Sequence, residues 1–209
     1  VAEVERHELM KLRCLNGTHS TLAYLGYLAG HETIAETVAD EAFARFVTRV
    51  WDEEIIPGLT PPPGVSLTDY SRALLARYAN PGIRHRTWQI AMDGSQKLPQ
   101  RILTQLAEGL AAGRAMSGLT LAVAAWMRYV GGTDEKGAAI DVRDPMAEKL
   151  KALSDAAPDP RGKAMALLGV AEVFPAELRD NADFRERLAT AYAGLAEKGA
   201  RAMVESCHA

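Results

Sequence analysis

Apolar residues recur every three or four positions along most of the chain, which is the spacing of one face of an α-helix. In residues 4–30 leucines stand at helical intervals, and Gly17 is a weak point in the middle of this stretch. A second helix is expected over 40–56, where Phe43 and Val47 fall on one face. Alternating patterns typical of strands are scarce, and Ala, Leu, Glu, Arg and Lys fill most positions. The pattern predicts an all-α fold.

Proline, glycine and polar clusters divide the helices. The proline-rich run 61–64 is a loop, and Ser66 with Asp69 three residues later forms an imperfect capping box for the next helix. That helix is expected to stop at residues 80–81, because proline disfavours helical geometry in the residue before it. The polar turn 131–137 has room for at most a short hairpin. Further helices are expected at 82–91, 99–113, 118–130, 145–156, 161–173 and 181–205.

Composition narrows the class of protein. The chain has 209 residues, of which 48% are hydrophobic and 24% charged, enough to bury one core. A net charge of −3 without a Lys/Arg run argues against nucleic acid as a partner. The most apolar stretch, 119–127, is about half the length that a membrane span needs. Cys14 and Cys207 lie at opposite ends, which is no disulfide framework and favours a reduced, cytoplasmic setting.

Several known motifs are missing from the sequence. No G-x-G-x-x-G follows a hydrophobic strand, and there is no P-loop, C-x-x-C or H-E-x-x-H. The chain begins with charged residues and no Met, which argues against a signal peptide and indicates a C-terminal piece of a longer protein or a trimmed form. On its own the chain therefore predicts no cofactor or metal site. Ordinary structural roles are expected for His7, His31 and His208 (surface or capping), Trp51, Trp88 and Trp126 (core), and Met146, Met165 and Met203 (helix interfaces).

The first candidate site lies in residues 11–20. On an α-helix the directions of Lys11 and His19 differ by about 80°, and Asn16 lies between them, over about 12 Å of axis. Each is a poor core residue, whereas Leu12 beside them is a good one. In the structural interpretation this is a solvated face, and the helix ends near Asn16. In the functional interpretation Lys11 exchanges a proton while Asn16 and His19 hold an oxygen that gains negative charge.

The second candidate site lies in residues 84–101, which are dense in hydrogen-bond donors. Asp93 and Ser95 flank a glycine in a tight turn before a helix that is expected to begin at Pro99. In the structural interpretation Asp93 and Ser95 cap that helix and the cations are solvated. The residues alone favour this structural interpretation.

Together these segments resemble one enzyme family. The motif K-L-x-x-L-N-x-x-H-S over residues 11–20 is similar to the signature of the mannitol dehydrogenase family, which includes fructuronate and tagaturonate reductases. The resemblance covers nearly the whole chain. It implies an all-α, multi-helical C-terminal substrate domain of a long-chain polyol dehydrogenase, whose N-terminal Rossmann domain, absent from this chain, binds NAD or NADP. The resemblance to the family also extends over residues 21–30 and 125–132, and over residues 80–81, 93–95 and Lys97.

The resemblance also implies roles for the residues of the first segment. Lys11 would be the general acid/base, and Asn16 and His19 would stabilise the charged oxygen. Lys97 would contact the hydroxyls or a carboxylate of the substrate. The chemistry requires no metal.

One departure separates two branches of the family. Mannitol-type members carry Arg where Gln89 stands, and they lack the pair His85 and Arg86, so this segment resembles the fructuronate reductase branch. A uronate carboxylate suits additional cations, because a guanidinium binds it in bidentate fashion. His85, Arg86 and Gln89 are therefore expected, with Lys97, to contact the substrate.

Three functions follow as expectations. The first is interconversion of a keto-uronate and a sugar acid, D-fructuronate and D-mannonate, with the Rossmann domain as partner. The second is a mannitol or other polyol 2-dehydrogenase domain. The third, of a different class, is a helical binding or dimerisation module that has lost catalysis, although the presence of Lys11, Asn16 and His19 together argues against such a loss. The choice between NAD and NADP, and the individual sugar, stay open.

Overall fold

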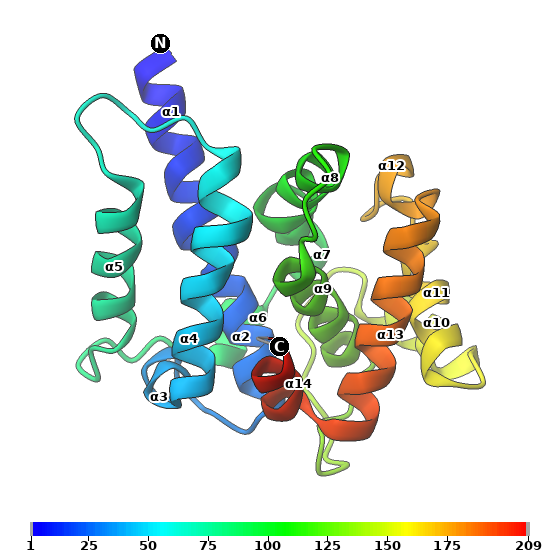
Figure 1. Ribbon diagram of the computed structural model, residues 1–209. Helices are drawn as coiled ribbons and strands as arrows, with labels where there is room; N and C mark the ends of the chain where they lie inside the picture. The colour runs from blue at the N-terminus through cyan, green and yellow to red at the C-terminus, as the bar shows by residue number, and fades with distance from the viewer. Residues whose placement is uncertain (1, 208–209) are drawn as a thin grey trace.

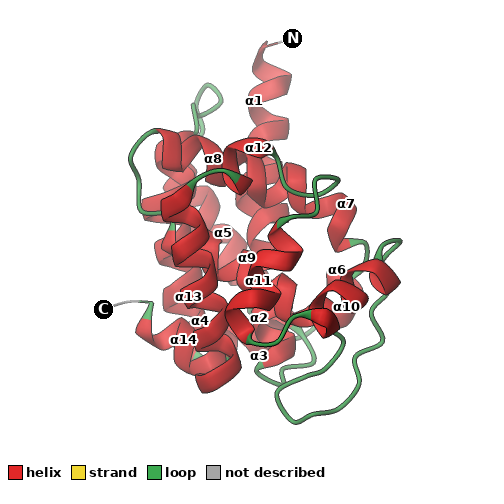
Figure 2. Cartoon of the chain, turned by 90° about the vertical axis from the view of Figure 1, so that its right-hand side faces the viewer, coloured by secondary structure: helices red, strands yellow, loops and turns green. Residues whose placement is uncertain are grey.

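The computed structural model describes residues 2–207, and within them the chain is built from helices without a β-strand (Figure 2). Two isolated antiparallel bridges pair Thr33 with Arg86 and Thr133 with Ala139. The second bridge lies at the polar turn 131–137, and this single pairing is consistent with the expectation that the turn holds at most a short hairpin. The predicted all-α fold is confirmed.

The first helical stretch runs unbroken from Ala2 to Leu28. It consists of α1 (Ala2–Met10), the π-helical η1 (Lys11–Gly17) and α2 (Thr18–Leu28). This confirms the helix expected over 4–30. The first part, α1, projects beyond the other helices (Figures 1 and 2), and residues 3–9 are exposed.

The next stretch confirms the helix expected over 40–56. It contains α4 (Glu41–Arg49), the π-helical η2 (Val50–Ile55) and the 3₁₀ turn η3 (Ile56–Gly58). The predicted apolar face is buried, including Phe43 and Val47. The short α3 (Ile34–Ala39) before it was not expected. A reciprocal capping box between Thr33 and Glu36 stabilises its first turn.

Helix α5 (Leu67–Tyr78) begins and ends close to where the sequence predicts. The hydroxyl of Ser66 accepts a hydrogen bond from the backbone N–H of Asp69 at 3.2 Å. Asn80 and Pro81 lie just beyond the last turn. The predicted N-cap is therefore confirmed.

The prediction of a helix over 82–91 is wrong for residues 82–86, which are not helical. Only α6 (Thr87–Ala91) is helical, because the chain before it is extended at Arg86 and pairs with Thr33. The helix expected to begin at Pro99 begins earlier, as α7 (Gly94–Leu98), and continues through the π-helical η4 (Pro99–Leu103) into α8 (Thr104–Ala111). The π-turn starts at Pro99, where proline supplies no N–H for an α-helical bond.

The C-terminal half surrounds one buried helix, α9 (Ser117–Val130). It packs against α2 and against α13 (Ala182–Lys198), and all but two of its residues are buried. Figure 1 shows α9 between the N-terminal helices and α13. The helix expected over 181–205 breaks at Gly199, whose φ of 81° is left-handed, and resumes as α14 (Ala200–Ser206). Three more helices complete this half: α10 (Ala147–Ala156), α11 (Pro160–Leu168) and α12 (Ala176–Arg179).

The expected roles of the aromatic residues are confirmed only in part. Trp51 and Trp126 are fully buried. Trp88 is half-buried instead. Its indole N–H donates to the backbone oxygen of Asp141, and Arg143 lies over its ring. His31 is also half-buried, with its ring edge-on to Phe43.

Other expectations concern the methionines, the remaining histidines and the membrane. Met146, Met165 and Met203 are partly buried against the core as expected. His7 is exposed, whereas His208 lies outside the described residues. Among residues 2–207 we find no helix that combines the length and the apolar character of a membrane span.

Candidate functional site

The π-turn η1 sets the geometry of Lys11, Asn16 and His19. A π-turn holds one residue more than an α-turn, so the eight positions from Lys11 to His19 cover the rotation of about seven α-helical steps. Counting that one extra residue, ideal geometry predicts an angle of about 20° between the two side-chain directions, compared with about 80° in a regular α-helix. Single π-turns of this kind occur often at functional sites.

Lys11 and Asn16 are open to solvent on this face. Lys11 is exposed, Asn16 is half-buried, and both line a shallow hollow with Leu9, Glu5 and Glu8 on the adjoining α1. Within the described part of the chain, neither side chain has a hydrogen bond or an ion pair. Both are thus free to meet a bound group.

His19 lies deeper than Lys11. Its ring stacks on Tyr78, with centroids 5.3 Å apart, and the Tyr78 hydroxyl is itself anchored by donating to the backbone oxygen of Leu15 at 2.9 Å. Nε2 of His19 is buried and has no hydrogen-bond partner among the described residues. Burial, followed by the nearby charges of His85 and Arg101, lowers the pKa of His19 to about 3. At neutral pH the imidazole is therefore uncharged and has an unused ring nitrogen.

The structure brings His85 to His19, although 66 residues separate them in the sequence. Their ring centroids are 5.0 Å apart. His85 is held there by its backbone, whose oxygen accepts a hydrogen bond from the N–H of Ile34 at 2.9 Å. Two of the predicted site residues, one from each candidate segment, are thus in contact.

Lys97 is half-buried on α7. Its ammonium donates to the backbone oxygen of Met92 at 2.6 Å and lies 3.7 Å from a carboxylate oxygen of Asp93. Burial, and next the charge of Arg101, lower the pKa of Lys97. The charge of Arg101 thus contributes to the lowered pKa of both Lys97 and His19.

The turn before Lys97 is capped from another part of the chain. The expectation that Asp93 and Ser95 cap this helix is wrong, because the backbone of Asp93 is left-handed (φ 55°) and its side chain makes no capping hydrogen bond. Asp144 takes this role: its carboxylate accepts from the Ser95 N–H at 2.7 Å and from the Ser95 hydroxyl at 2.6 Å. The loop carrying Asp144 therefore fixes the start of α7 and, with it, the position of Lys97.

Arg86 and Gln89 lie apart from Lys11. Arg86 is exposed and lines a different hollow, with Trp88, His31 and Lys136. Gln89 is exposed on α6. The structure does not bring these two predicted side chains to the hollow of Lys11.

Sequence reasoning missed Tyr78 and Arg101. Tyr78 supports the ring of His19, and no local pattern marks it, since it is the last residue of an ordinary amphipathic helix. Arg101 donates to the hydroxyl of Ser20, the residue after His19, at 3.1 Å. A signal for Arg101 was present, because it closes the basic segment 84–101.

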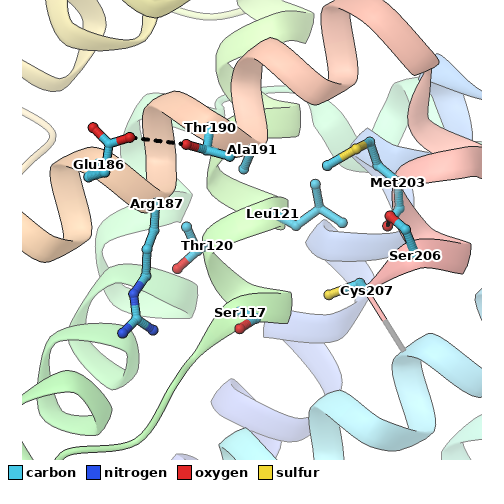
Figure 3. Close-up of a pocket in the computed structure, with 10 residues that line it drawn as sticks. All are labelled: Ser117, Thr120, Leu121, Glu186, Arg187, Thr190, Ala191, Met203, Ser206 and Cys207. Carbon is cyan, nitrogen blue, oxygen red and sulfur yellow. Dashed lines mark hydrogen bonds between the residues drawn. The ribbon is translucent and has the colours of Figure 1, made fainter. Parts of the chain in front are cut away.

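A further hollow lies between α9, α13 and α14 and contains none of the predicted residues. Its lining side chains come from these three helices and from Cys207, which directly follows α14 (Figure 3). Leu121 and Met203 contribute apolar side chains to its lining, and the Thr190 hydroxyl donates a hydrogen bond to the Glu186 carboxylate at 3.4 Å. It is separate from the site around Lys11.

Neither a metal nor a dinucleotide has a recognisable cradle within residues 2–207. No three His, Cys, Asp or Glu side chains in that range are grouped to hold a metal ion. No strand–glycine turn–helix unit occurs there to take a pyrophosphate. These described residues therefore do not fit a bound nicotinamide dinucleotide by themselves.

Comparison with known proteins shows similarity along almost the whole chain. The sequence profile of the family described as "Mannitol dehydrogenase C-terminal domain" matches residues 3–196. D-mannonate oxidoreductase of Escherichia coli (strain K12) is 48% identical over 98% of this chain. Mannitol 2-dehydrogenase of Phaeosphaeria nodorum is 40% identical over 98% of it. A solved ternary complex of Pseudomonas fluorescens mannitol 2-dehydrogenase with NAD and D-mannitol superposes with a TM-score of 0.91 at 32% identity and covers 96% of this chain.

The match extends over less than half of each of these relatives. The chain covers 42% of the D-mannonate oxidoreductase and 35% of the P. nodorum enzyme. It covers 40% of the chain in the solved complex. What these relatives do as whole proteins therefore involves segments that this chain does not contain.

Proposed function

The chain belongs to the mannitol dehydrogenase C-terminal domain family, and from this premise we propose that it is the helical catalytic part of an oxidoreductase. The reaction that we propose interconverts D-fructuronate and D-mannonate with NAD or NADP. The observation that carries the proposal is the uncharged, unpartnered imidazole of His19 in the same continuous helical stretch as Lys11 and Asn16. The 48% identity to a D-mannonate oxidoreductase supports the choice of substrate.

The three side chains act on the carbonyl oxygen of the substrate. When that carbonyl is reduced, its oxygen gains negative charge and must be stabilised and protonated. The amide of Asn16 and the ring nitrogen of His19, when it carries the proton, donate hydrogen bonds to this oxygen. Lys11 delivers the proton, and in the oxidation direction it removes the proton from the hydroxyl.

The hydride comes from a nicotinamide that other segments hold. A bound nicotinamide supplies or accepts hydride at the carbon of the reacting group. We place its site in an N-terminal Rossmann domain of the same protein, since the described residues have no cradle for it. The exposed α1 supports such a neighbour, because Val4 (59% exposed) and Leu9 (37% exposed) are the large hydrophobic residues left uncovered in the described chain. Both cysteines are free thiols, which supports a cytoplasmic setting.

The charges around His19 favour an acidic sugar over a neutral one. Burial is the largest cause of the lowered pKa of His19, and His85, Arg101 and Arg77 lower it further, so two guanidiniums and an imidazole that can carry positive charge lie near the ring. A carboxylate would be attracted to this region, whereas a neutral polyol would gain little from it. The alternative substrate, mannitol or another polyol, has support from the mannitol 2-dehydrogenases among the relatives.

A substrate panel on the full-length protein tests this proposal. Nicotinamide absorbance would be followed with D-fructuronate, D-fructose and D-mannitol, and with NAD and NADP in turn. We expect kcat/KM for D-fructuronate to exceed that for D-fructose by at least tenfold, because a site built for an anion leaves its cation unpaired with a neutral ketose. Equal turnover of the two, or a preference for mannitol, would overturn the uronate assignment. No turnover of any of them would favour a binding module that has lost catalysis.

A further inference from the structure

We propose that the guanidinium of Arg101 binds the carboxylate of the acidic sugar and so determines the specificity of this site. The inference rests on the proposed keto-uronate reaction and adds the residue that recognises its anionic substrate. It differs from the sequence-based expectation, which assigned that role to Lys97, His85 and Arg86.

Arg101 enters the site through the contact between two π-turns. Its backbone, in η4, packs on η1 so closely that a Cβ on Gly17 would lie 2.8 Å from the Arg101 carbonyl oxygen. The side chain then reaches α2, where Nη1 donates to the hydroxyl of Ser20 at 3.1 Å. Ser20 directly follows His19, and the charge of Arg101 contributes to lowering the pKa of His19, so the guanidinium lies in the neighbourhood of the ring that we place at the reacting oxygen.

The charge of Arg101 has no counter-ion in residues 2–207. No carboxylate oxygen of this range lies within 4.0 Å of it, although the side chain is half-buried. Arg13, which is buried in the neighbouring η1, shows the usual arrangement, since it pairs with Glu108 at 2.6 Å. A partly buried cation without an anion is unfavourable. An anionic ligand would remove that cost.

The other cations of the segment are less suited to the role. Lys97 already has Asp93 at 3.7 Å and donates to a backbone oxygen, so its charge is partly offset. Arg84 and Arg86 are exposed, and Arg86 lines the separate hollow beside Trp88. Arg101 is also a guanidinium, whose planar fork matches a carboxylate in bidentate fashion.

Electrostatic effects on the neighbours agree with this placement. The charge of Arg101 contributes to lowering the pKa of both His19 and Lys97. It is therefore close enough to act on the group at the reacting oxygen and on the predicted substrate ligand at once. A carboxylate bound at Arg101 would balance this positive charge.

The test is a comparison of acidic and neutral substrates in the full-length protein. Arg101→Met removes the guanidinium and keeps an apolar stem, and Arg101→Lys keeps a charge without the fork. Arg72→Met is the matched control, because Arg72 lies on the exposed face of α5 with only Asp69 at 3.6 Å. For each variant kcat and KM would be measured with D-fructuronate and with D-fructose, after circular dichroism has confirmed folding.

We expect Arg101→Met to lower kcat/KM for D-fructuronate by about 10- to 100-fold, the range for losing hydrogen bonds to a charged group, mostly through KM. The value for D-fructose should stay within about threefold, and Arg72→Met should change neither. Arg101→Lys should retain part of the preference for D-fructuronate over D-fructose. If Arg101→Met does not fold, Arg101→Lys alone tests the proposal, and a preference within twofold of that of the wild type would contradict it.

Two other results would overturn the inference. An equal loss with both substrates would show that Arg101 only supports the packing of η1 on η4. An unchanged preference in Arg101→Met would show that another group binds the carboxylate. A wild-type protein that does not prefer D-fructuronate at all would instead refute the proposed function, so the two failures can be told apart.

Discussion

At the scale of single residues, the environment of His19 decides what the site can do at neutral pH. A histidine in water would be partly protonated there, but burial and neighbouring cations lower the pKa of this one to about 3. The ring is therefore available as a neutral hydrogen-bonding group. Its planar support, Tyr78, is anchored to the backbone of the same helix at Leu15 and holds the ring in place.

The lowered pKa of His19 predicts a pH dependence of stability. The folded-state pKa of about 3 lies below the ordinary value of 6.5, so between these pH values the unfolded chain binds a proton that the folded chain does not. Stability is thus full above about pH 6.5 and falls on acidification, by at most about 5 kcal/mol for this group and less where solvent reaches the ring. Urea unfolding of wild type and His19→Gln at pH 7 and pH 4.5 checks this: wild type should lose more stability than the variant. Equal losses would show that the ring is not held in its neutral form.

Lys11 should carry the proton transfer. In the full-length protein we expect Lys11→Ala to lower kcat by about 10²–10⁴-fold, the range for removing a general acid or base, with a much smaller change in substrate affinity. Lys198→Ala, at the exposed end of α13, is the control of equal charge change and should have no effect. Steady-state kinetics across the pH range measures both. A Lys11→Ala rate within threefold of wild type would remove Lys11 from the mechanism.

At the scale of elements, two π-turns meet where the site is built. η1 contains Lys11 and Asn16 and leads directly into α2 with His19, and η4 supplies Arg101 from the facing helix. Gly17 permits the close contact between them, which explains a glycine inside a continuous helix. Without a side chain at this position the two backbones approach closely enough for Arg101 to reach α2.

Gly17→Ala should therefore be destabilising. The added Cβ would lie 2.8 Å from the backbone oxygen of Arg101, and a backbone atom cannot swing away as a side chain can. We expect a loss of about 1–3 kcal/mol in the free energy of unfolding, despite the higher helix propensity of alanine. Gly162→Ala in α11, where the nearest atom would be 3.5 Å away, is the control and should be neutral or stabilise by up to about 1 kcal/mol. Denaturant unfolding of both variants measures the difference, and equal stabilities would contradict the close contact.

At the scale of the whole molecule, one continuous core joins the helices. It extends from Met10 in the first helical stretch to Val204 in α14, with α9 in the middle. Such a core should allow the chain to fold by itself as a single cooperative unit. The site lies at the edge of this core, and α1 projects past it into solvent (Figure 1).

The isolated chain should not bind the nucleotide cofactor. A titration with NADH followed by fluorescence should show no saturable binding, because the described residues form no dinucleotide cradle. The full-length protein, titrated in the same way, is the positive control. Micromolar binding by the 209-residue chain would reveal a nucleotide site that the fold does not indicate.

Features that depend on near neighbours in the chain followed from the sequence alone. The spacing of apolar residues predicted the helices over 4–30 and 40–56, and the cap at Ser66 was predicted from Asp69 three residues away. Lys11, Asn16 and His19 were singled out together for the same reason, since they lie on one short segment. Helical periodicity and capping act within about four residues, so a sequence records them directly.

Features that depend on contacts between distant segments were decided by the tertiary structure. Asp144 rather than Asp93 caps α7, the loop at 82–86 is extended because it pairs with Thr33, and His85 meets His19 across 66 positions. The unpaired state of Arg101 is of the same kind, because only the packed molecule shows that no carboxylate of the described residues reaches it. Whether a polar side chain is satisfied by its own fold or left for a ligand is a property of the three-dimensional surroundings, which no local pattern encodes.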